Sequence, residues 1–522
     1  MDYELTVDTI VRRAEMLFAH KEIVTRRPDR SLHRTTYGET CRRARALGSA
    51  LRSRGVERGD RVATLGWNTV EHLEAYLGIP TAGAVVHTLN LRLHPEELAW
   101  IAAHAGDRVL IVDESLVPLA EQVVPRTAIE HVVVIGDSYE ELVASGDPNA
   151  PAVELDEDEA AAMCYTSGTT ARPKGVLYSH RALVLHSLTS LAAGLLGIRE
   201  TDVVLPVVPM FHANAWGLPY TSTLAGASLV LPGRHLDPQA LVETLEAERV
   251  TITGGVPTIW RGILQLLDSE PGRYDLSALR SMVVGGSAAP RSMIEGFERR
   301  HGLHVCHAWG MTEMAPLGTV AELPSDLAEA GDDERLAFRS TQGRPVPFVE
   351  IRARGEDGAL VPWDGETMGE LEVRGVWIAG AYYDAPEAAD RWTNDGWFKT
   401  GDIVTIDGHA SITIQDRSKD VIKSGGEWIS SVALENALMA HPAVAEAAVI
   451  GVPDEQWQER PLAAVVLRDE ASVDELRDFL ARDFAKWQLP ERFEFVDEIP
   501  KTAVGKFRKT ALRERFAARA PA

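Results

Sequence analysis

From residue 61 to residue 284, short apolar runs rich in β-branched residues alternate with longer stretches in which apolar residues recur with the helical period. The runs expected to form strands are residues 61–65, 109–112, 131–135, 203–206, 228–231, 250–253 and 281–284. Strands that alternate with amphipathic helices are the pattern of an α/β fold.

The pattern changes in the second half of the chain. Around residues 348–354 and 368–374, shorter strands are separated by Gly and Asp turns, which indicates a small β-rich subdomain. A polar stretch at residues 415–420 then precedes a segment with its own strand and helix alternation, including apolar runs at 445–451 and 461–467. We therefore predict a domain boundary after residue 416, with domains at residues 1–416 and 417–522.

Composition agrees with a globular, multidomain protein. The chain has 522 residues, more than a single hydrophobic core usually serves, and is 45% hydrophobic and 25% charged. Its formal net charge of −24 argues against nucleic acid or an anionic membrane surface as a partner. No apolar run of about 18 residues occurs, so we expect no membrane span.

Cysteine usage and the N-terminus bear on the compartment. Cys41, Cys164 and Cys306 lie far apart, which excludes a CxxC metal or redox motif and a disulfide framework. Residues 1–4 lack the basic and apolar regions of a signal peptide. We expect a cytoplasmic protein.

The segment at residues 165–176 is rich in Ser, Thr and Gly and ends in a lysine followed by a glycine. Gly168 and Gly175 permit close backbone approach, and Lys174 adds a charge worth about 4 kcal/mol against a phosphate at about 4 Å. A Walker A loop would end in Gly-Lys-Ser/Thr, and this one does not. A polyphosphate-binding loop is therefore one interpretation, and a polar surface loop is the other.

Further motifs follow in a fixed order along nearly the whole chain. They occupy residues 209–212, 284–290, 309–313, 400–402, 416–420, 423–427 and 500–506. Together with the loop at 165–176, they resemble the adenylate-forming (ANL) acyl-CoA synthetases, relatives of firefly luciferase and of peptide-synthetase adenylation domains. Residues 209–220 look most like the medium- and long-chain fatty-acyl branch.

The resemblance implies both a fold and an activity. The implied fold is a large N-terminal domain of two α/β subdomains plus a β-barrel, with a small mobile α+β C-terminal domain. The implied activity is ATP-dependent conversion of a carboxylic acid to an acyl-adenylate with release of pyrophosphate, followed by transfer to coenzyme A with release of AMP. The expected acid is a medium- or long-chain fatty acid or an aryl-aliphatic acid, with Mg²⁺ as cofactor. Similar bacterial enzymes are commonly homodimers.

Two other activities stay open from the sequence. One is a ligase that adenylates an acid but passes it to a carrier protein or a nitrogen nucleophile. The other is a nucleotide-binding relative without catalysis, against which Lys174, Glu313, Asp402 and Lys506 argue. An α-amino acid substrate is not expected, because His212 stands where amino-acid-activating relatives have an aspartate.

The resemblance assigns roles residue by residue. ATP and AMP binding fall to Thr166, Ser167, Gly168, Thr169, Thr170, Lys174, Gly285, Gly286, Ser287, Ala288, Trp309, Gly310, Met311, Thr312, Asp402 and Arg417. Catalysis falls to Lys506, Thr312, Glu313 and His212, with Glu313 also the Mg²⁺ ligand. The acyl pocket comprises His212, Trp216 and Gly310, the coenzyme A loop Lys423, Gly425 and Gly426, and the hinge Lys419.

The residue types suit these roles, although each has a plainer interpretation. Lys506 would neutralise charge on the α-phosphate, but a lone lysine in a basic tail is usually solvated. Thr312 and Glu313 also form a helix-capping pair, and Trp216 also suits a buried aromatic cluster. Two positions depart from the family: Ala171 replaces a usual glycine, and Trp309 replaces a usual tyrosine, so it can stack but lacks the hydroxyl.

Overall fold

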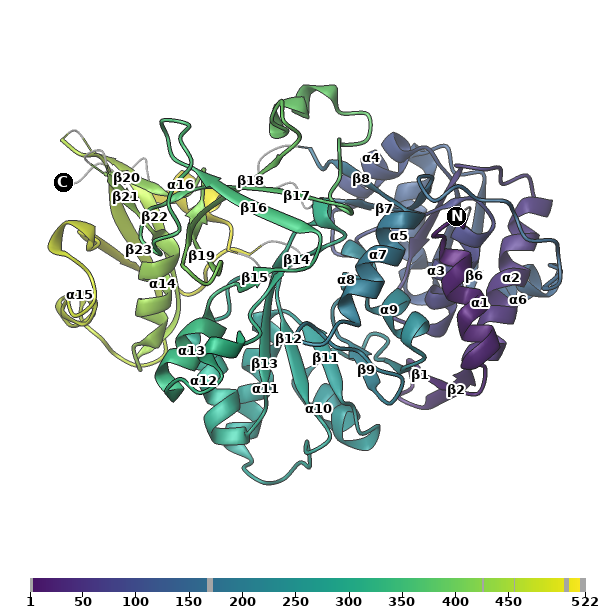
Figure 1. Ribbon diagram of the computed structural model, residues 1–522, viewed down its shortest axis with the longest axis horizontal. Helices are drawn as coiled ribbons and strands as arrows, with labels where there is room; N and C mark the ends of the chain where they lie inside the picture. Colours follow the sequence, from purple (N-terminus) through teal and green to yellow (C-terminus); the bar gives the residue numbers. More distant parts are fainter. Residues whose placement is uncertain (1–2, 167–171, 425–426, 455, 502–506, 517–522) are drawn as a thin grey trace.

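A computed structural model describes residues 3–166, 172–424, 427–454, 456–501 and 507–516, and its strands form four sheets (Figure 1). Two large sheets lie in the N-terminal part, a four-stranded antiparallel sheet follows, and a five-stranded sheet completes the chain. The expected mixed α/β class with a small α+β C-terminal domain is confirmed. Within the described residues, no helix is both long and apolar enough to cross a membrane.

The first large sheet has the strand order β6-β5-β3-β4-β7-β8. Its strands are β3 (Arg61–Leu65), β4 (Val85–Thr88), β5 (Asp107–Asp113), β6 (His131–Ile135), β7 (Ala160–Tyr165) and β8 (Gly175–Ser179). All neighbours are parallel except β7 and β8, which form an antiparallel hairpin. Strand β8 is at the edge of the sheet, so Lys174, which immediately precedes it, lies at that edge.

The second sheet has nine strands in the order β15-β14-β13-β12-β11-β9-β10-β1-β2. They are β1 (Glu22–Arg26), β2 (Leu32–Thr36), β9 (Val203–Pro206), β10 (Ser228–Leu231), β11 (Ile252–Gly255), β12 (Ser281–Val284), β13 (Val305–Gly310), β14 (Leu317–Val320) and β15 (Arg344–Pro345). The strand expected at residues 250–253 begins two residues later, at Ile252. The parallel strands β9, β11 and β12 end at the same edge, where ligands of α/β folds bind.

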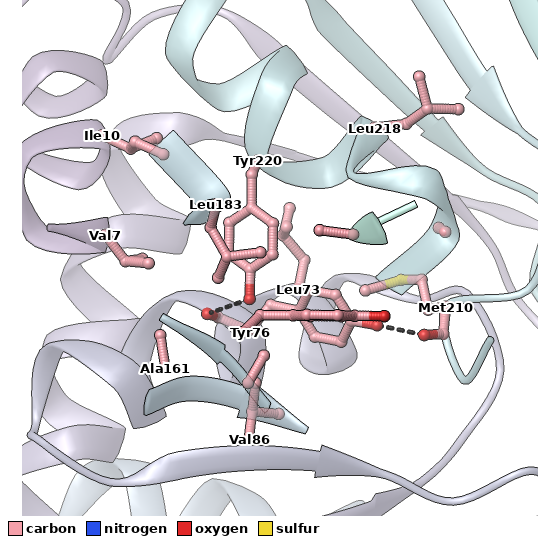
Figure 2. Packing of buried hydrophobic residues seen from close by; sticks show 14 of the residues in the cluster. Val7, Ile10, Leu73, Tyr76, Val86, Ala161, Leu183, Met210, Leu218 and Tyr220 are labelled. Carbon is pink, nitrogen blue, oxygen red and sulfur yellow. Dashed lines mark hydrogen bonds between the residues drawn. The ribbon is translucent and has the colours of Figure 1, made fainter. Parts of the chain in front are cut away.

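Five helices pack in the core between the two large sheets. They are α1 (Val7–Leu17), α2 (Tyr37–Ser53), α3 (Val70–Thr81), α7 (His180–Ser190) and α9 (Leu218–Ala225). Helix α3 is apolar around most of its circumference, and every residue from 70 to 80 is buried. Figure 2 shows Tyr76 of α3 and Tyr220 of α9 meeting at the centre of this core, with ring centroids 5.5 Å apart.

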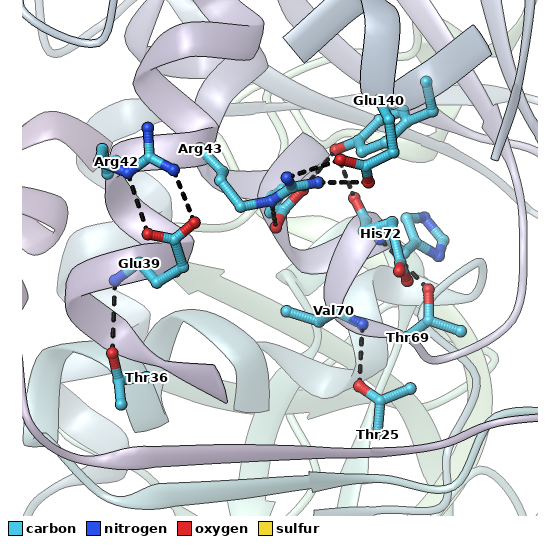
Figure 3. A network of polar contacts seen from close by, with 12 residues as sticks. Thr25, Thr36, Glu39, Arg42, Arg43, Thr69, Val70, His72 and Glu140 are labelled. Atoms are coloured by element: carbon cyan, nitrogen blue, oxygen red, sulfur yellow. Dashed lines mark hydrogen bonds and ion pairs between the residues drawn. The ribbon is translucent and has the colours of Figure 1, made fainter. Parts of the chain in front are cut away.

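Side-chain caps and ion pairs fix how α2 and α3 start (Figure 3). Thr36 accepts a hydrogen bond from the amide of Glu39, and Thr69 accepts one from the amide of His72. Arg43 of α2 then pairs with Glu74 of α3 and with Glu140 of α6 (Asp137–Ala144), each at 2.7 Å. The Thr69 cap therefore fixes the start of α3, and the Arg43 ion pairs fix α2 against α3 and α6.

The C-terminal third contains the two smaller sheets. The antiparallel sheet comprises β16 (Val349–Arg354), β17 (Gly369–Gly375), β18 (Phe398–Ile406) and β19 (Ile412–Arg417). The five-stranded sheet comprises β20 (Ile422–Ser424), β21 (Glu427–Ile429), β22 (Val444–Asp454), β23 (Gln458–Leu467) and β24 (Arg492–Phe495), with α14 (Ser431–Ala440), α15 (Val473–Leu480) and α16 (Lys509–Phe516). It has apolar clusters of its own, one with α14 and α15 and one with α16. In Figure 1 it lies at the opposite end of the molecule from α1 and α2.

Candidate active site

The β7–β8 hairpin presents the lysine of the Ser/Thr/Gly-rich loop. The two ends of the loop are joined by hydrogen bonds, from the Lys174 amide to Thr166 Oγ1 at 3.1 Å and from the Thr166 amide to the Lys174 carbonyl at 3.0 Å. The Lys174 ammonium lies 5.3 Å from the centre of the Tyr382 ring and 3.7 Å from Glu387. The ammonium is therefore held beside an aromatic face at the mouth of the loop.

Glu313 lies in a short 3₁₀ turn, η4 (Thr312–Met314), that follows β13. Its side chain is buried, and the Tyr382 hydroxyl donates a 2.5 Å hydrogen bond to it. Burial and the nearby Glu313 carboxylate raise the pKa of Tyr382, so the phenol stays protonated and remains a donor. The Tyr178 hydroxyl donates to the Thr312 carbonyl at 2.6 Å. Tyr382 thus joins Lys174 to Glu313, a link the sequence analysis missed.

Trp309 stands where the family usually has a tyrosine, and its indole makes a polar contact that the sequence analysis did not predict. Its Nε1 donates to Asp402 Oδ2 at 3.2 Å, and Arg417 Nε lies 3.0 Å from Asp402 Oδ1. Asp402 is 2% exposed and lies within β18, opposite Arg417 of β19, rather than in a free turn. Three residues expected to bind the nucleotide are therefore in direct contact.

An apolar cavity opens at the carboxyl ends of β9, β11 and β12. Its empty space, counted together with its opening to solvent, is about 640 Å³. It is lined by Arg92, Val207, Val208, Pro209, His212, Trp216, Val256, Thr258, Ile259, Gly286 and Ser287. The structure therefore brings His212 and Trp216 together with Gly286 and Ser287, and it adds Arg92, whose guanidinium lies 5.9 Å from the Phe211 ring centre.

Trp216 stands at the end of a left-handed turn, α8 (Ala213–Trp216). Four consecutive non-glycine residues have φ between 43° and 57°, and Gly217 follows at 73°. Such a backbone costs roughly 1–2 kcal/mol per non-glycine residue. Cys164 helps to hold it, because its thiol donates to Asn214 Oδ1 at 3.0 Å. Strain of this kind is concentrated at functional sites, which favours a working role for Trp216.

Gly285 makes room for the Trp216 ring. A Cβ at Gly285 would lie 3.2 Å from the indole and 3.0 Å from the Ala308 carbonyl oxygen. The small residue at 285 therefore admits Trp216 here. Gly310, which was assigned to the acyl pocket, must be a glycine for another reason: a Cβ there would lie 1.8 Å from the Pro316 carbonyl oxygen.

Lys423, predicted to belong to the coenzyme A loop, lies apart from the cavity, whereas the predicted hinge, Lys419, comes two residues after Arg417. Lys423 of β20 pairs with Glu356 at 2.5 Å, on the turn between β16 and β17, and in Figure 1 β20 is far from α8. Lys419 lies in the turn between β19 and β20. Lys501 and Phe507 form a β-bridge. Several predicted site residues lie outside the described residues: Ser167, Gly168, Thr169, Thr170, Gly425, Gly426 and Lys506.

The described residues fit Mg²⁺ in one way only. Among them, no group of three or more His, Cys, Asp or Glu side chains could hold a metal ion. Mg²⁺ in nucleotide sites is bound by one or two carboxylates together with phosphate oxygens. The buried Glu313 carboxylate, which Tyr382 links to Lys174, suits that arrangement, and phosphate oxygens and water would supply the remaining ligands.

Comparisons with known proteins agree over the length of the chain. The AMP-binding enzyme family model matches residues 13–383, and the model of the AMP-binding enzyme C-terminal domain matches residues 433–506. The chain is 49% identical to a long-chain-fatty-acid–CoA ligase of Thermus thermophilus, over 99% of this chain and 96% of that protein. It is 44% identical to a 3-methylmercaptopropionyl-CoA ligase of Ruegeria lacuscaerulensis, over 99% and 98%. The crystal structure of the anthranilate CoA ligase AuaEII in complex with anthranoyl-AMP superposes with a TM-score of 0.88 at 28% identity, covering 98% of each chain.

Proposed function

Because this chain belongs to the family of AMP-binding enzymes, we propose that it uses ATP to convert a carboxylic acid into an acyl-adenylate and then transfers the acyl group to coenzyme A. The observation that carries the proposal is the position of the apolar cavity. It is lined by Gly286 and Ser287, which follow β12, and the next strand of the same sheet, β13, contains Trp309, ends at Gly310 and leads to Glu313. An acid in the cavity would have its carboxylate close to a bound nucleotide.

The proposed chemistry has two displacements. A carboxylate oxygen attacks the α-phosphorus of ATP, and the bond to pyrophosphate breaks. The thiol of coenzyme A then loses its proton and attacks the acyl carbon, and the bond to AMP breaks. Such phosphoryl chemistry depends mainly on positioning and on neutralising phosphate charge.

We assign the parts as follows. Lys174 and the loop at residues 166–170 hold the phosphates, and Asp402 accepts hydrogen bonds from the ribose hydroxyls, aided by Arg417. Glu313 would hold Mg²⁺, which when bound neutralises charge on the triphosphate. Lys506 approaches the α-phosphate from the small domain. Gly285, Gly286, Ser287 and Ala288 face the adenine, and Gly310 and Met311 also contribute to nucleotide binding.

The acid is proposed to be a medium- or long-chain fatty acid or an aryl-aliphatic acid. The apolar cavity walls and the 49% identity to the Thermus long-chain ligase support this. The 44% identity to a 3-methylmercaptopropionyl-CoA ligase supports a second candidate, a short thioether acid. The test is a panel of fatty, aryl-aliphatic and thioether acids with ATP and Mg²⁺, in which pyrophosphate release is followed with and without coenzyme A. Turnover that requires an amine or a carrier protein instead of coenzyme A would contradict the proposal.

The small domain is proposed to begin after residue 416 and to turn about Lys419 between two orientations. Asp416 of β19 accepts a hydrogen bond from the Ser431 amide of α14 at 2.8 Å, and Lys423 is paired with Glu356. Both contacts must break if the loop around residues 423–426 is to reach the cavity. The described orientation is therefore not the one proposed for thioester formation.

Two further features are proposed. The three cysteines are buried and unpaired, which suits a reducing, cytoplasmic compartment. A homodimer is proposed as the assembly, and sedimentation analysis would distinguish it from a monomer.

A further inference from the structure

The wall of the apolar cavity is a segment without regular strand partners. Residues 207–210 follow β9, which ends at Pro206, and Val207, Val208 and Pro209 line the cavity. The amides of Val207 and Val208 both reach the Gly254 carbonyl, at 3.0 and 2.9 Å. Buried backbone groups need partners, so the remaining polar groups of this wall must be satisfied by other means.

Asn68 supplies three of those hydrogen bonds. Its Nδ2 donates to the Pro206 carbonyl at 2.8 Å and to the Val208 carbonyl at 3.0 Å, and its Oδ1 accepts from the Met210 amide at 2.8 Å. The side chain is 4% exposed, and both of its N–H groups are used. Two carbonyl oxygens on one side and an amide on the other allow only one orientation of the Asn68 side chain.

Asn68 is itself fixed from both directions. The Gly233 amide donates to the Asn68 carbonyl at 3.0 Å, and the following residue, Thr69, caps α3 (Figure 3). The Val70 amide then donates to Thr25 of β1 at 3.1 Å. The clamp on the cavity wall is therefore anchored to the framework that joins the two large sheets.

Tyr76, two turns along α3, supplies a fourth contact. Its ring is fully buried, and its hydroxyl donates to the Met210 carbonyl (Figure 2). The Tyr220 hydroxyl also donates to a main-chain carbonyl, that of Tyr76, at 3.4 Å. Tyr76 is not part of the cavity wall, so this hydrogen bond does not hold the wall. That carbonyl has no helical partner, because the residue four positions later is Pro80, which lacks an N–H.

We propose that Asn68 and Tyr76 are positioning residues that set the acid specificity of the cavity, although neither one lines it. The inference rests on the proposed function, in which this cavity takes the acyl group. Asn68 fixes the carbonyls on either side of Val207 and the amide that follows Pro209, so it fixes where these side chains point. Tyr76 fixes the end of the same segment, two residues before His212.

The decisive comparison is between two Tyr→Phe variants. Tyr76→Phe and Tyr220→Phe each keep a fully buried ring and each remove one donor from a buried main-chain carbonyl. The measured quantities are KM and kcat for acids of graded chain length, and KM for ATP, in the pyrophosphate-release assay. We expect Tyr76→Phe to raise KM for the preferred acid about tenfold, the usual effect of one buried hydrogen bond, and to broaden the chain-length profile. Tyr220→Phe should leave the acid KM and the chain-length profile unchanged. The KM for ATP should stay constant in the Tyr76→Phe and Tyr220→Phe variants.

Asn68→Ala provides a stronger test in the same direction. It removes three contacts with the wall, so its chain-length profile should be broader than that of Tyr76→Phe. If Asn68→Ala does not fold, the two tyrosine variants still decide the question.

Two results would overturn the inference. One is an equal change in acid KM for Tyr76→Phe and Tyr220→Phe, and the other is a parallel rise in KM for ATP, because each would indicate general loosening of the core. The failure of the proposed function looks different: the unaltered enzyme would release no pyrophosphate with any acid in the panel.

Discussion

The contact between Trp309 and Asp402 leads to a sharp prediction about nucleotide binding. Trp309→Phe keeps an aromatic ring in a site that is 7% exposed but removes the indole N–H that reaches Asp402 at 3.2 Å. A hydrogen bond to a charged group contributes roughly 1.5–3 kcal/mol, and this rather long one belongs near the lower end. A loss of about 1.5 kcal/mol corresponds to about a tenfold fall in kcat/KM for ATP.

The assay is ATP–pyrophosphate exchange with ATP and with analogues that lack one ribose hydroxyl. We assume that Asp402 binds the ribose and that Trp309 orients Asp402. Removing a ribose hydroxyl from ATP should then lower kcat/KM by a smaller factor in Trp309→Phe than in the unaltered enzyme. This non-additivity is the signature of coupled groups. The Arg417 contact at 3.0 Å remains in the variant, so Asp402 keeps its cationic neighbour.

Trp377→Phe is the matched control. Trp377 is 3% exposed, and its indole N–H donates to the Leu317 carbonyl at 3.0 Å rather than to a site residue. It should leave the ratio between ATP and the deoxy analogues unchanged. Equal effects of the two substitutions on that ratio, or strictly additive losses in Trp309→Phe, would refute the reasoning.

Four further predictions concern other parts of the protein. Glu313→Gln should keep the fold but slow pyrophosphate release most at limiting Mg²⁺, because the triphosphate charge is less well compensated; a rate independent of Mg²⁺ would contradict the assignment. Trp216→Ala should alter the acid preference in the panel while KM for ATP stays constant. Equal changes in the KM for the acid and the KM for ATP would indicate that Trp216 serves only in packing. Lys506→Ala should lose about 10²–10³-fold in adenylate formation but still make thioester from supplied adenylate, whereas Lys419→Pro should do the reverse; loss of both steps in both folded variants would contradict the two-orientation mechanism. Burial lowers the pKa of His304, but the neighbouring carboxylates of Glu322, at 2.9 Å, and Glu298, at 3.7 Å, outweigh burial and raise the pKa to about 9. The stabilising effect of these contacts is therefore full below the ordinary pKa of 6.5 and is lost as pH rises through about 9. The difference in urea midpoint between the unaltered protein and His304→Gln should therefore be large near about pH 6 and small near about pH 10.

Much of the fold follows from local patterns in the sequence. The strands at residues 61–65, 131–135, 203–206, 228–231 and 281–284 agree with β3, β6, β9, β10 and β12. Buried parallel strands such as β3, β9, β10 and β12 are continuous apolar runs, and the edge strand β6, although partly exposed, is still a run of β-branched residues. The strands β1 and β2 were not anticipated. Residues 32–36 are mostly polar and exposed, and an edge strand of this kind has no apolar run to reveal it.

The contacts that shape the candidate site could not be predicted in the same way. Tyr382 reaches Glu313 across 69 positions, Trp309 reaches Asp402 across 93, and Asn68 reaches Met210 across 142. Each depends on how distant elements pack, and a single sequence contains no signal for such a pairing. The left-handed turn at residues 213–216 was also unforeseen, because its four residues include no glycine and give no local indication of positive φ.

Heavy-oxygen labelling of the acid carboxylate tests the central claim most directly. In the proposed chemistry a carboxylate oxygen attacks the α-phosphorus, and that oxygen leaves with AMP when coenzyme A takes the acyl group. With ATP, Mg²⁺, coenzyme A and a labelled acid that is turned over, mass spectrometry should find one labelled oxygen in each AMP and none in pyrophosphate. Label in pyrophosphate or inorganic phosphate, or unlabelled AMP formed together with the acyl-CoA, would show that the reaction does not pass through an acyl-adenylate.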